Sequence, residues 1–375
     1  MAGIYIHIPF CKTRCAYCDF YSTTQTSLRE RYIQALCREL ELRNGYLQGH
    51  HVHTVYFGGG TPSQLRPTDL ERIFGLLYKV YGLEQCTEIT LEANPDDLTD
   101  DYVAALARLP FNRVSMGIQT FHDPTLRLLN RRHTAAQAVA AVNRLRRAGI
   151  RNISIDLIYG LPGETQERWE ADLRQALSLD VEHISAYLLT YEEGTPLYRM
   201  KQQGQVQEAD EDSCLCFFTT LMDTLAANGY EHYEISNFCK PGFHSRHNSS
   251  YWQGTPYLGC GPSAHSYNGQ TRSWNTPSID RYLAGIDSGQ PASDTERLSL
   301  HTRYNEYIMT RLRTRQGASL NTLRQDFGQS LTDYCLHAAA QHLAANRLET
   351  TNGYLRLTRQ GIFVSDDILS DLMYV

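Results

Sequence analysis

The sequence lacks the features that define several broad classes of protein. None of its apolar runs approaches the ~18 residues needed to cross a bilayer, and its start lacks the basic region and cleavage site of a secretory signal. It has no low-complexity tract. A net charge of −6 over 375 residues does not indicate a general nucleic-acid surface. With 42% apolar and 20% charged residues, the composition is that of a globular protein, and we expect it to be cytoplasmic.

Three cysteines near the start are spaced as C-x3-C-x2-C, at Cys11, Cys15 and Cys18. Thiolates this close together suit a metal centre. A [4Fe–4S] cluster ordinarily takes four cysteines, so a set of three leaves one iron open to chelate an amino group and a carboxylate. Zinc is the competing metal, but structural zinc sites usually show a second ligand pair further along, and none is evident here. The spacing therefore favours an iron–sulfur cluster.

Strand and helix patterns alternate through the first half of the chain. Such alternation predicts parallel strands joined by right-handed helical crossovers. Six units indicate a partial (β/α)6 barrel, with an open doubly wound sheet as the alternative. The expected strands are 4–8, 54–57, 88–95, 113–120, 152–163 with its loop, and 182–190.

Polar and glycine residues recur where these strands end, which is where such barrels place their binding groups. The glycines of 58–60 can let a ligand approach the backbone closely. Glu92 can accept hydrogen bonds from both hydroxyls of a ribose. Taken singly, each also fits an ordinary turn or loop. The set comprises Cys11, Gly58 to Thr61, Glu92, Gln119, Asp156 and Thr190.

The cysteine motif, with Tyr17 before its last cysteine, resembles the signature of the radical S-adenosylmethionine (SAM) enzymes. Tyr5, six residues before Cys11, makes it similar to the oxygen-independent coproporphyrinogen oxidase group. Members with oxidase activity carry a further cysteine two residues on, where this chain has Phe20. The resemblance implies a [4Fe–4S] cluster on the three cysteines and one or two SAM molecules. By that resemblance, the SAM contacts are Tyr5, Tyr17, Gly59, Gly60, Thr61, Glu92, Gln119, Arg131 and Asp156.

Residues 231–299 are rich in aromatic, Gly, Pro, Ser and Asn residues and show no clear period, so we expect an irregular segment. Within it, His247 begins the stretch HNSSYW, which is similar to the signature of HemW-type haem chaperones. The resemblance implies that His247 binds haem. The alternative is an aromatic turn in which His247 is hydrogen-bonded to the backbone. Further candidate ligands are His232, His244 and His265.

Residues 300–375 show three helical patterns, followed by a hairpin at Asn352-Gly353. This order resembles a winged helix, although Lys and Arg are too sparse to indicate DNA binding. A role in packing or in covering a substrate fits better. The expected organisation is a radical SAM barrel at 1–230, the irregular segment at 231–299, and a small winged-helix-like α+β domain at 300–375.

The resemblance covers nearly the whole chain and implies a haem chaperone. Such a protein binds a [4Fe–4S] cluster, SAM and haem, and passes haem to membrane-bound respiratory haem proteins. Any membrane contact would be peripheral, at the inner face, and the choice between monomer and homodimer stays open. The alternative is oxygen-independent coproporphyrinogen III oxidase, against which Phe20 argues. A radical SAM enzyme with an unrelated substrate is a third reading.

Overall fold

The structure, a computed structural model, describes residues 1–375, and six parallel strands lie at its centre. Each opens a strand–helix unit, as the sequence predicts. In the first strand Ile4, Ile6 and Ile8 are fully buried on one face, while Tyr5 and His7 point to the other. The strands are β1 (Ala2–Ile8), β2 (Val52–Gly59), β3 (Glu88–Ala93), β4 (Arg113–Gln119), β5 (Asn152–Tyr159) and β6 (His183–Leu188).

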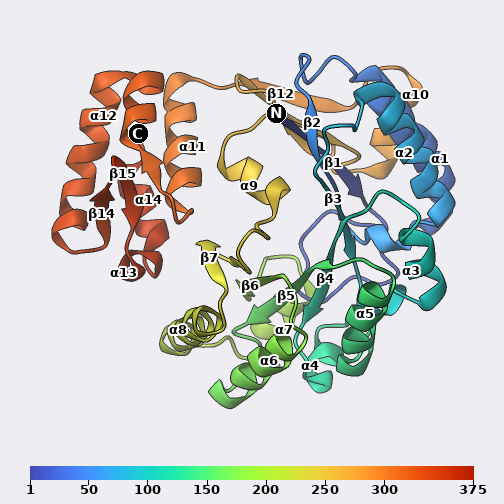
Figure 1. Ribbon diagram of the computed structural model, residues 1–375, viewed down its shortest axis with the longest axis horizontal. Helices are drawn as coiled ribbons and strands as arrows, with labels where there is room; N and C mark the ends of the chain where they lie inside the picture. The colour runs from blue at the N-terminus through green and yellow to red at the C-terminus, as the bar shows by residue number, and fades with distance from the viewer.

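Helices between these strands cover the outer face of the sheet (Figure 1). Their ends follow the usual capping chemistry: the Thr134 hydroxyl accepts the backbone N–H of Gln137, whose side chain accepts the N–H of Thr134. The α-helices are α1 (Arg29–Leu42), α2 (Pro67–Tyr81), α3 (Asp100–Leu106), α4 (Asp123–Leu128), α5 (Ala135–Arg147), α6 (Gln166–Ser178), α7 (Pro196–Gln202) and α8 (Glu211–Ala227). Short 3-10 turns are η1 (Thr26–Leu28), η2 (Pro62–Gln64) and η3 (Pro95–Asp97).

Residues 231–299 are more regular than the sequence predicts, because they extend both sides of the same sheet. Their strands are only three to five residues long, too short for a period to show in the sequence. They are β7 (Glu231–Glu234), β8 (Asn237–Cys239), β9 (Tyr257–Cys260), β10 (His265–Tyr267), β11 (Thr271–Asn275) and β12 (Ser293–Arg297), with helices α9 (Arg246–Trp252) and α10 (Ile279–Asp287). The full order is β12-β11-β10-β9-β1-β2-β3-β4-β5-β6-β8-β7.

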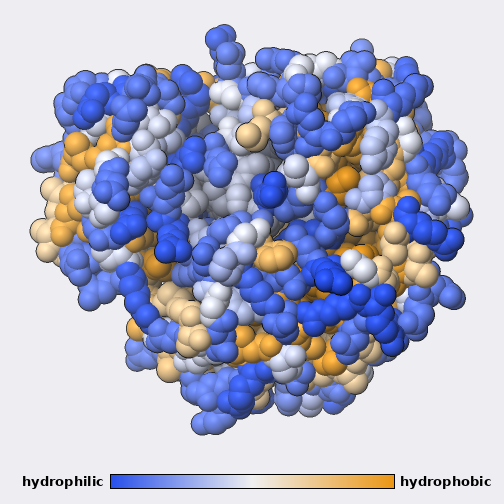
Figure 2. Space-filling view, viewed as in Figure 1, coloured by the Kyte–Doolittle hydropathy of each residue, from blue (hydrophilic) through white to orange (hydrophobic).

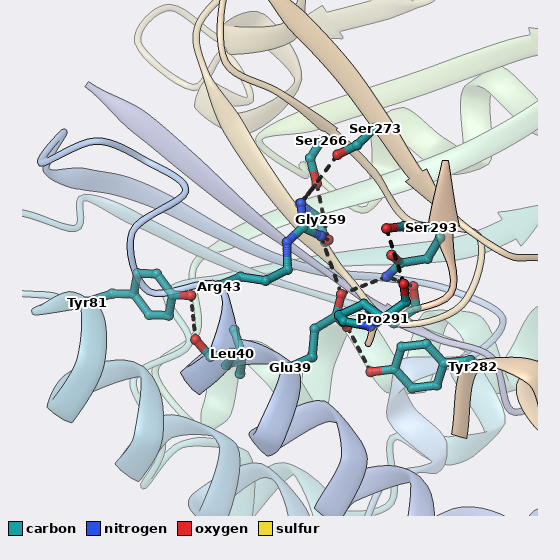
Figure 3. Close-up of polar contacts among 12 residues, drawn as sticks. Glu39, Leu40, Arg43, Tyr81, Gly259, Ser266, Ser273, Tyr282, Pro291 and Ser293 are labelled. Atoms are coloured by element: carbon teal, nitrogen blue, oxygen red, sulfur yellow. Dashed lines mark hydrogen bonds and ion pairs between the residues drawn. The ribbon is translucent and has the colours of Figure 1, made fainter. Parts of the chain in front are cut away.

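A buried ion pair ties the added strands to α1 (Figure 3). Glu39 has no exposed side-chain surface and lies 3.3 Å from Arg43. Its carboxylate accepts hydrogen bonds from the Gly261 N–H, the Asn275 amide and the Tyr282 hydroxyl, at 2.7 to 2.8 Å. Arg43 in turn donates to the Gly259 carbonyl and to the hydroxyls of Ser266 and Ser273. These partners satisfy the two charges and hold β9 to β11 against the barrel.

The C-terminal unit has a hydrophobic core of its own and stands beside the barrel (Figure 1). Its helices are α11 (Leu300–Leu312), α12 (Leu320–Ala344), α13 (Arg359–Ile362) and α14 (Ser365–Leu372). Its strands are β13 (Ala318–Ser319), β14 (Leu348–Thr351) and β15 (Tyr354–Leu357), in the antiparallel order β13-β15-β14. Gly328 breaks α12 where the sequence separates two helical patterns, and Asn352-Gly353 turns the hairpin with positive φ at both residues. The unit is the expected winged-helix-like α+β domain.

No helix in the chain is both long enough and apolar enough to span a bilayer.

Candidate cofactor site

A cavity of about 550 Å³ opens at the carboxyl ends of the parallel strands. The cysteine loop after β1 forms one side, and the ends of β2, β3, β4, β5 and β6 form most of the rest. All of the cluster and SAM residues that the resemblance implies, except Tyr5, lie on its wall. They are Cys11, Cys15, Tyr17, Cys18, Gly59, Gly60, Thr61, Glu92, Gln119, Arg131 and Asp156.

The three cysteines line the same cavity. In a multi-iron cluster each thiolate binds a different iron, so the cluster needs a cavity with several cysteines on its wall. Cys11 Sγ lies 3.2 Å from the Thr61 hydroxyl. Burial raises the pKa of the Cys11 and Cys18 thiols, that of Cys18 to about 11, so cluster binding would release protons. The residues present therefore fit a [4Fe–4S] cluster.

Arg131 brings a positive charge to the wall of the cavity. Its guanidinium donates to Cys15 Sγ at 3.3 Å, to the Asn94 side chain at 2.9 Å, and to the Gly117 carbonyl. Its Nε is buried and has no hydrogen-bond partner. Because a buried donor without a partner costs free energy, this N–H suits an acceptor on a bound ligand, such as a carboxylate.

The glycines at the end of β2 are needed because the chain packs closely against β1 and the cysteine loop, whether or not a ligand is bound. Gly59 has φ +106°, and a Cβ there would lie 2.7 Å from the His7 ring. A Cβ on Gly60 would lie 2.9 Å from the backbone of Pro9. The absence of side chains lets this turn pass against the start of the cysteine loop, so the backbone itself faces the cavity.

Glu92 and Asp156 are half-buried carboxyl groups on the wall of the cavity. Glu92 accepts hydrogen bonds from the Tyr56 hydroxyl at 2.7 Å and from the Gly59 N–H at 3.2 Å. Burial raises its pKa to about 7, and the Asp156 charge adds to the shift. Burial also raises the pKa of Asp156, whose Oδ1 lies 3.4 Å from the Ser115 hydroxyl. Glu92 can thus be ionised or protonated near neutral pH, and its ionised form can accept ribose hydroxyls.

Gln119 adopts a left-handed backbone conformation, with φ 72°, at a register shift between β4 and β5. Positive φ is uncommon for a residue with a side chain and often occurs at binding sites. The bulge places Gln119 on the cavity wall.

Tyr5 and His247 lie outside this cavity. Tyr5 packs on Tyr56, the hydrogen-bond partner of Glu92, with ring centroids 6.2 Å apart. His247 is fully buried on α9, and both its ring nitrogens are engaged, 2.8 Å from the hydroxyls of Thr54 and Tyr251. In this conformation neither nitrogen is free to bind iron. The environment is therefore close to the alternative in which His247 is a hydrogen-bonded residue of an aromatic turn. The partners are hydroxyl groups rather than the backbone.

Phe20, the residue where the oxidases carry a cysteine, is 68% exposed. It lies on the rim of the cofactor cavity and also lines a second, neighbouring cavity. The fourth-cysteine position thus sits between two hollows of the molecule.

Among the polar wall residues that the sequence analysis missed are Asn94, Ser115 and Tyr187. Asn94 follows β3 directly, so the strand-end rule that selected Glu92 could have found it. Ser115 and Tyr187 lie within β4 and β6, where only the inward half of an alternating strand faces the cavity.

Family models match two parts of the chain. The model of the Radical SAM superfamily matches residues 5–176, and that of the HemN C-terminal domain matches residues 298–364. The solved structure of coproporphyrinogen III oxidase (HemN) from Escherichia coli, described as a radical SAM enzyme, shares the fold. Its TM-score is 0.85 at 23% identity, over 99% of this chain and 90% of that one. The fold and the cysteine loop are thus those of a radical SAM protein, a class whose domain implies a [4Fe–4S] cluster and SAM.

Relatives in sequence place the chain more narrowly. A protein of Lactococcus lactis named "Heme chaperone HemW" is 37% identical over 324 residues, which are 86% of this chain and 84% of that protein. A protein of the same name from Bacillus subtilis is 33% identical over 98% of both chains. One from Mycobacterium tuberculosis is 35% identical over 99% of this chain and 94% of its own. The chain therefore belongs to the HemW family.

Proposed function

We propose that this protein is a haem chaperone that holds haem and passes it to membrane-bound haem proteins. The observation that carries the proposal is the 33–37% identity to the HemW proteins over most of their length. Phe20 in place of a fourth cysteine supports it, because the oxidases of the wider group carry that cysteine. The work would take place in the cytoplasm, at the inner face of the membrane. The receiving respiratory protein, and a homodimer, belong to the proposal as well.

The cluster would be held by Cys11, Cys15 and Cys18, with SAM beside it. When bound, the cluster and SAM supply an electron donor and a cleavable sulfonium. The carboxyl of Glu92 would accept the ribose hydroxyls, and Arg131 would hold the methionine carboxylate. Tyr5 would support Glu92 through Tyr56, and His247 would fix α9 beside the haem. The remaining contacts would come from Tyr17, Gly59, Gly60, Thr61, Gln119 and Asp156.

Haem titration of the purified protein, after anaerobic reconstitution of the cluster, tests the proposal. We expect saturable binding by absorption and transfer of the haem to a membrane-embedded apo-haem protein. Replacement of all three cysteines by Ala should remove the broad iron–sulfur absorption. Wild-type protein that binds no haem saturably would overturn the chaperone.

The second candidate is the oxygen-independent oxidative decarboxylation of coproporphyrinogen III. It shares the barrel, the cluster and the SAM contacts, and the likeness to the oxidase supports the fold alone. An anaerobic assay with SAM, a reductant and coproporphyrinogen III separates the two functions. Turnover to protoporphyrinogen without haem binding would favour the oxidase.

A further inference from the structure

The second cavity that Phe20 borders lies between the barrel and the C-terminal unit and has a volume of about 800 Å³. Small-molecule sites measure roughly 300–1,000 Å³, so its size is that of a ligand site. One wall comes from α9 and β9 to β11, and the other from α11 and α12. Figure 2 shows the surface hollowed between the two units where α9 lies in Figure 1, and the cavity there is a different one, lined by Ala2, Ser249 and Trp252.

Aromatic side chains line this cavity from both units. Tyr251, Tyr257 and Tyr267 lie on the barrel side, and Tyr307 and Phe327 on the C-terminal side. Tyr251 belongs to the HNSSYW stretch, so that stretch reaches this cavity through its tyrosine. Flat apolar walls on two opposed sides suit a flat, largely apolar molecule.

One histidine of the cavity has both ring nitrogens available. The ring of His265 makes no hydrogen bond, is exposed, and stacks on Trp274 with centroids 6.1 Å apart. His7 lines the same cavity, but its nitrogens lie 3.2 Å from the Tyr5 hydroxyl and 3.1 Å from the Tyr21 carbonyl. A neutral imidazole with a free nitrogen can ligate iron.

The position of His265 is well supported. It begins β10, next to Ser266, whose hydroxyl accepts a hydrogen bond from Arg43 at 3.0 Å. The buried pair of Glu39 and Arg43 therefore fixes the strand that carries the imidazole (Figure 3).

Three arginines supply positive charge to the same cavity, and Arg311 among them donates to the Gln253 carbonyl at 2.9 Å. Arg303 makes no ion pair or side-chain hydrogen bond, whereas Arg272 pairs with Glu306 at 2.7 Å. An unpaired guanidinium at the edge of an apolar cavity suits a carboxylate, which it can bind with two hydrogen bonds.

The geometry points to a tetrapyrrole site in this cavity, with His265 as the iron ligand and Arg303 as the partner of a propionate. This inference rests on the proposed function and deepens it, because it names where haem binds and which residues hold it. Bound there, haem would lie next to the cofactor cavity, separated from it by Phe20.

A rival cavity, also of about 800 Å³, lies at the amino ends of β1 and β2. It contains two histidines, His53 and His244, and four arginines, but only two aromatic residues, Tyr233 and Trp252. Fewer aromatic side chains line it than line the cavity beside Phe20, so it suits a planar macrocycle less well. His53 therefore provides a matched control.

The test compares haem titrations of the full-length protein with those of His265→Ala, Arg303→Ala and His53→Ala. We expect His265→Ala to raise the Kd for haem by about 10–100-fold and to shift the Soret band. Arg303→Ala should raise Kd by about 10–100-fold, as expected for a lost charged hydrogen bond, and leave the band position unchanged. His53→Ala should bind as wild type. Because His265 and Arg303 are not buried, their variants should keep the iron–sulfur absorption of the folded protein.

Iron-free protoporphyrin IX separates the two contacts. Arg303→Ala should weaken its binding, whereas His265→Ala should not, because no iron is present to ligate. Equal losses with and without iron in His265→Ala would overturn the ligand assignment.

The outcomes also separate this site from the proposed function. Wild-type protein that binds no haem would overturn the chaperone. Saturable wild-type binding that is unchanged in His265→Ala, or lost only in His53→Ala, would overturn the site and leave the chaperone standing.

Discussion

Glu92 is the residue on which nucleoside recognition in the proposed cofactor site depends most directly. Two hydrogen bonds fix its carboxyl group at the end of β3, and it faces the cavity that the cysteines border. Replacing Glu92 by Ala should weaken SAM binding by about 10–100-fold, since hydrogen bonds to a charged group are lost. The iron–sulfur absorption should stay intact, and Glu71→Ala, on the exposed face of α2, is the control. Unchanged SAM affinity by titration would remove Glu92 from the site.

The raised pKa of Glu92 predicts a dependence of SAM binding on pH. Below about 7 the carboxyl is protonated and is a poorer acceptor, so SAM affinity should fall as the pH falls through about 7. In the ligand-free protein the folded pKa lies above the usual 4.5. The stability contributed by this group is therefore present below about 4.5 and is lost as the pH rises through about 7. The profile for Glu92→Gln should be flatter, and parallel profiles would contradict the assignment.

His247 should contribute to the stability of the fold rather than ligate iron directly. The substitution His247→Ala leaves the buried Thr54 hydroxyl and the partly buried Tyr251 hydroxyl without this partner, which costs about 1–3 kcal/mol of unfolding free energy. Denaturant unfolding measures this loss against His50→Ala, an exposed histidine. If His247→Ala left the free energy of unfolding unchanged and still abolished haem binding, His247 would be assigned as the iron ligand.

At the scale of elements, α1 does more than cover the sheet, because its charged residues hold β9 to β11. Removing one partner of a buried ion pair costs about 3–5 kcal/mol. We expect Glu39→Ala to lose up to about this much, since Arg43, whose side chain is 13% exposed, would stay largely buried without its carboxylate. The control is Glu41→Ala on the exposed face of the same helix. Equal unfolding midpoints for the two variants would contradict a structural role for the network.

The parallel strands could be predicted because each has six to eight residues and is followed by a helical period. The carboxyl ends of parallel strands meet at one edge, and this rule brought Cys11, Glu92 and Asp156 together in advance. The strands of residues 231–299 could not be predicted, because they are short and rest on long-range partners such as Glu39. No local pattern reports that the two nitrogens of His247 are engaged by Thr54 and Tyr251.

At the scale of the whole molecule, two hydrophobic cores stand side by side, one in the barrel and one in residues 304–372. A Cβ on Gly317, at φ +78°, would collide with the Leu355 carbonyl. Gly317→Ala should therefore destabilise the C-terminal unit by more than about 1 kcal/mol. Calorimetry should show an earlier transition for this unit and an unchanged one for the barrel. Gly353→Ala should destabilise the unit less than Gly317→Ala, because a Cβ on Gly353 would contact no other atom. A single shifted transition would contradict independent cores.

The aromatic cavity has one wall on the barrel and one on the C-terminal unit. The binding of haem is therefore coupled to the binding of an acceptor protein. A ligand held by both walls stabilises their contact. Suppose that an acceptor protein binds by drawing α11 away from the barrel. By thermodynamic linkage, the acceptor then lowers the affinity for haem by the same factor by which bound haem lowers the affinity for the acceptor. Unloading would then need no change at the iron. The binding energy of the acceptor would separate the two walls of the cavity.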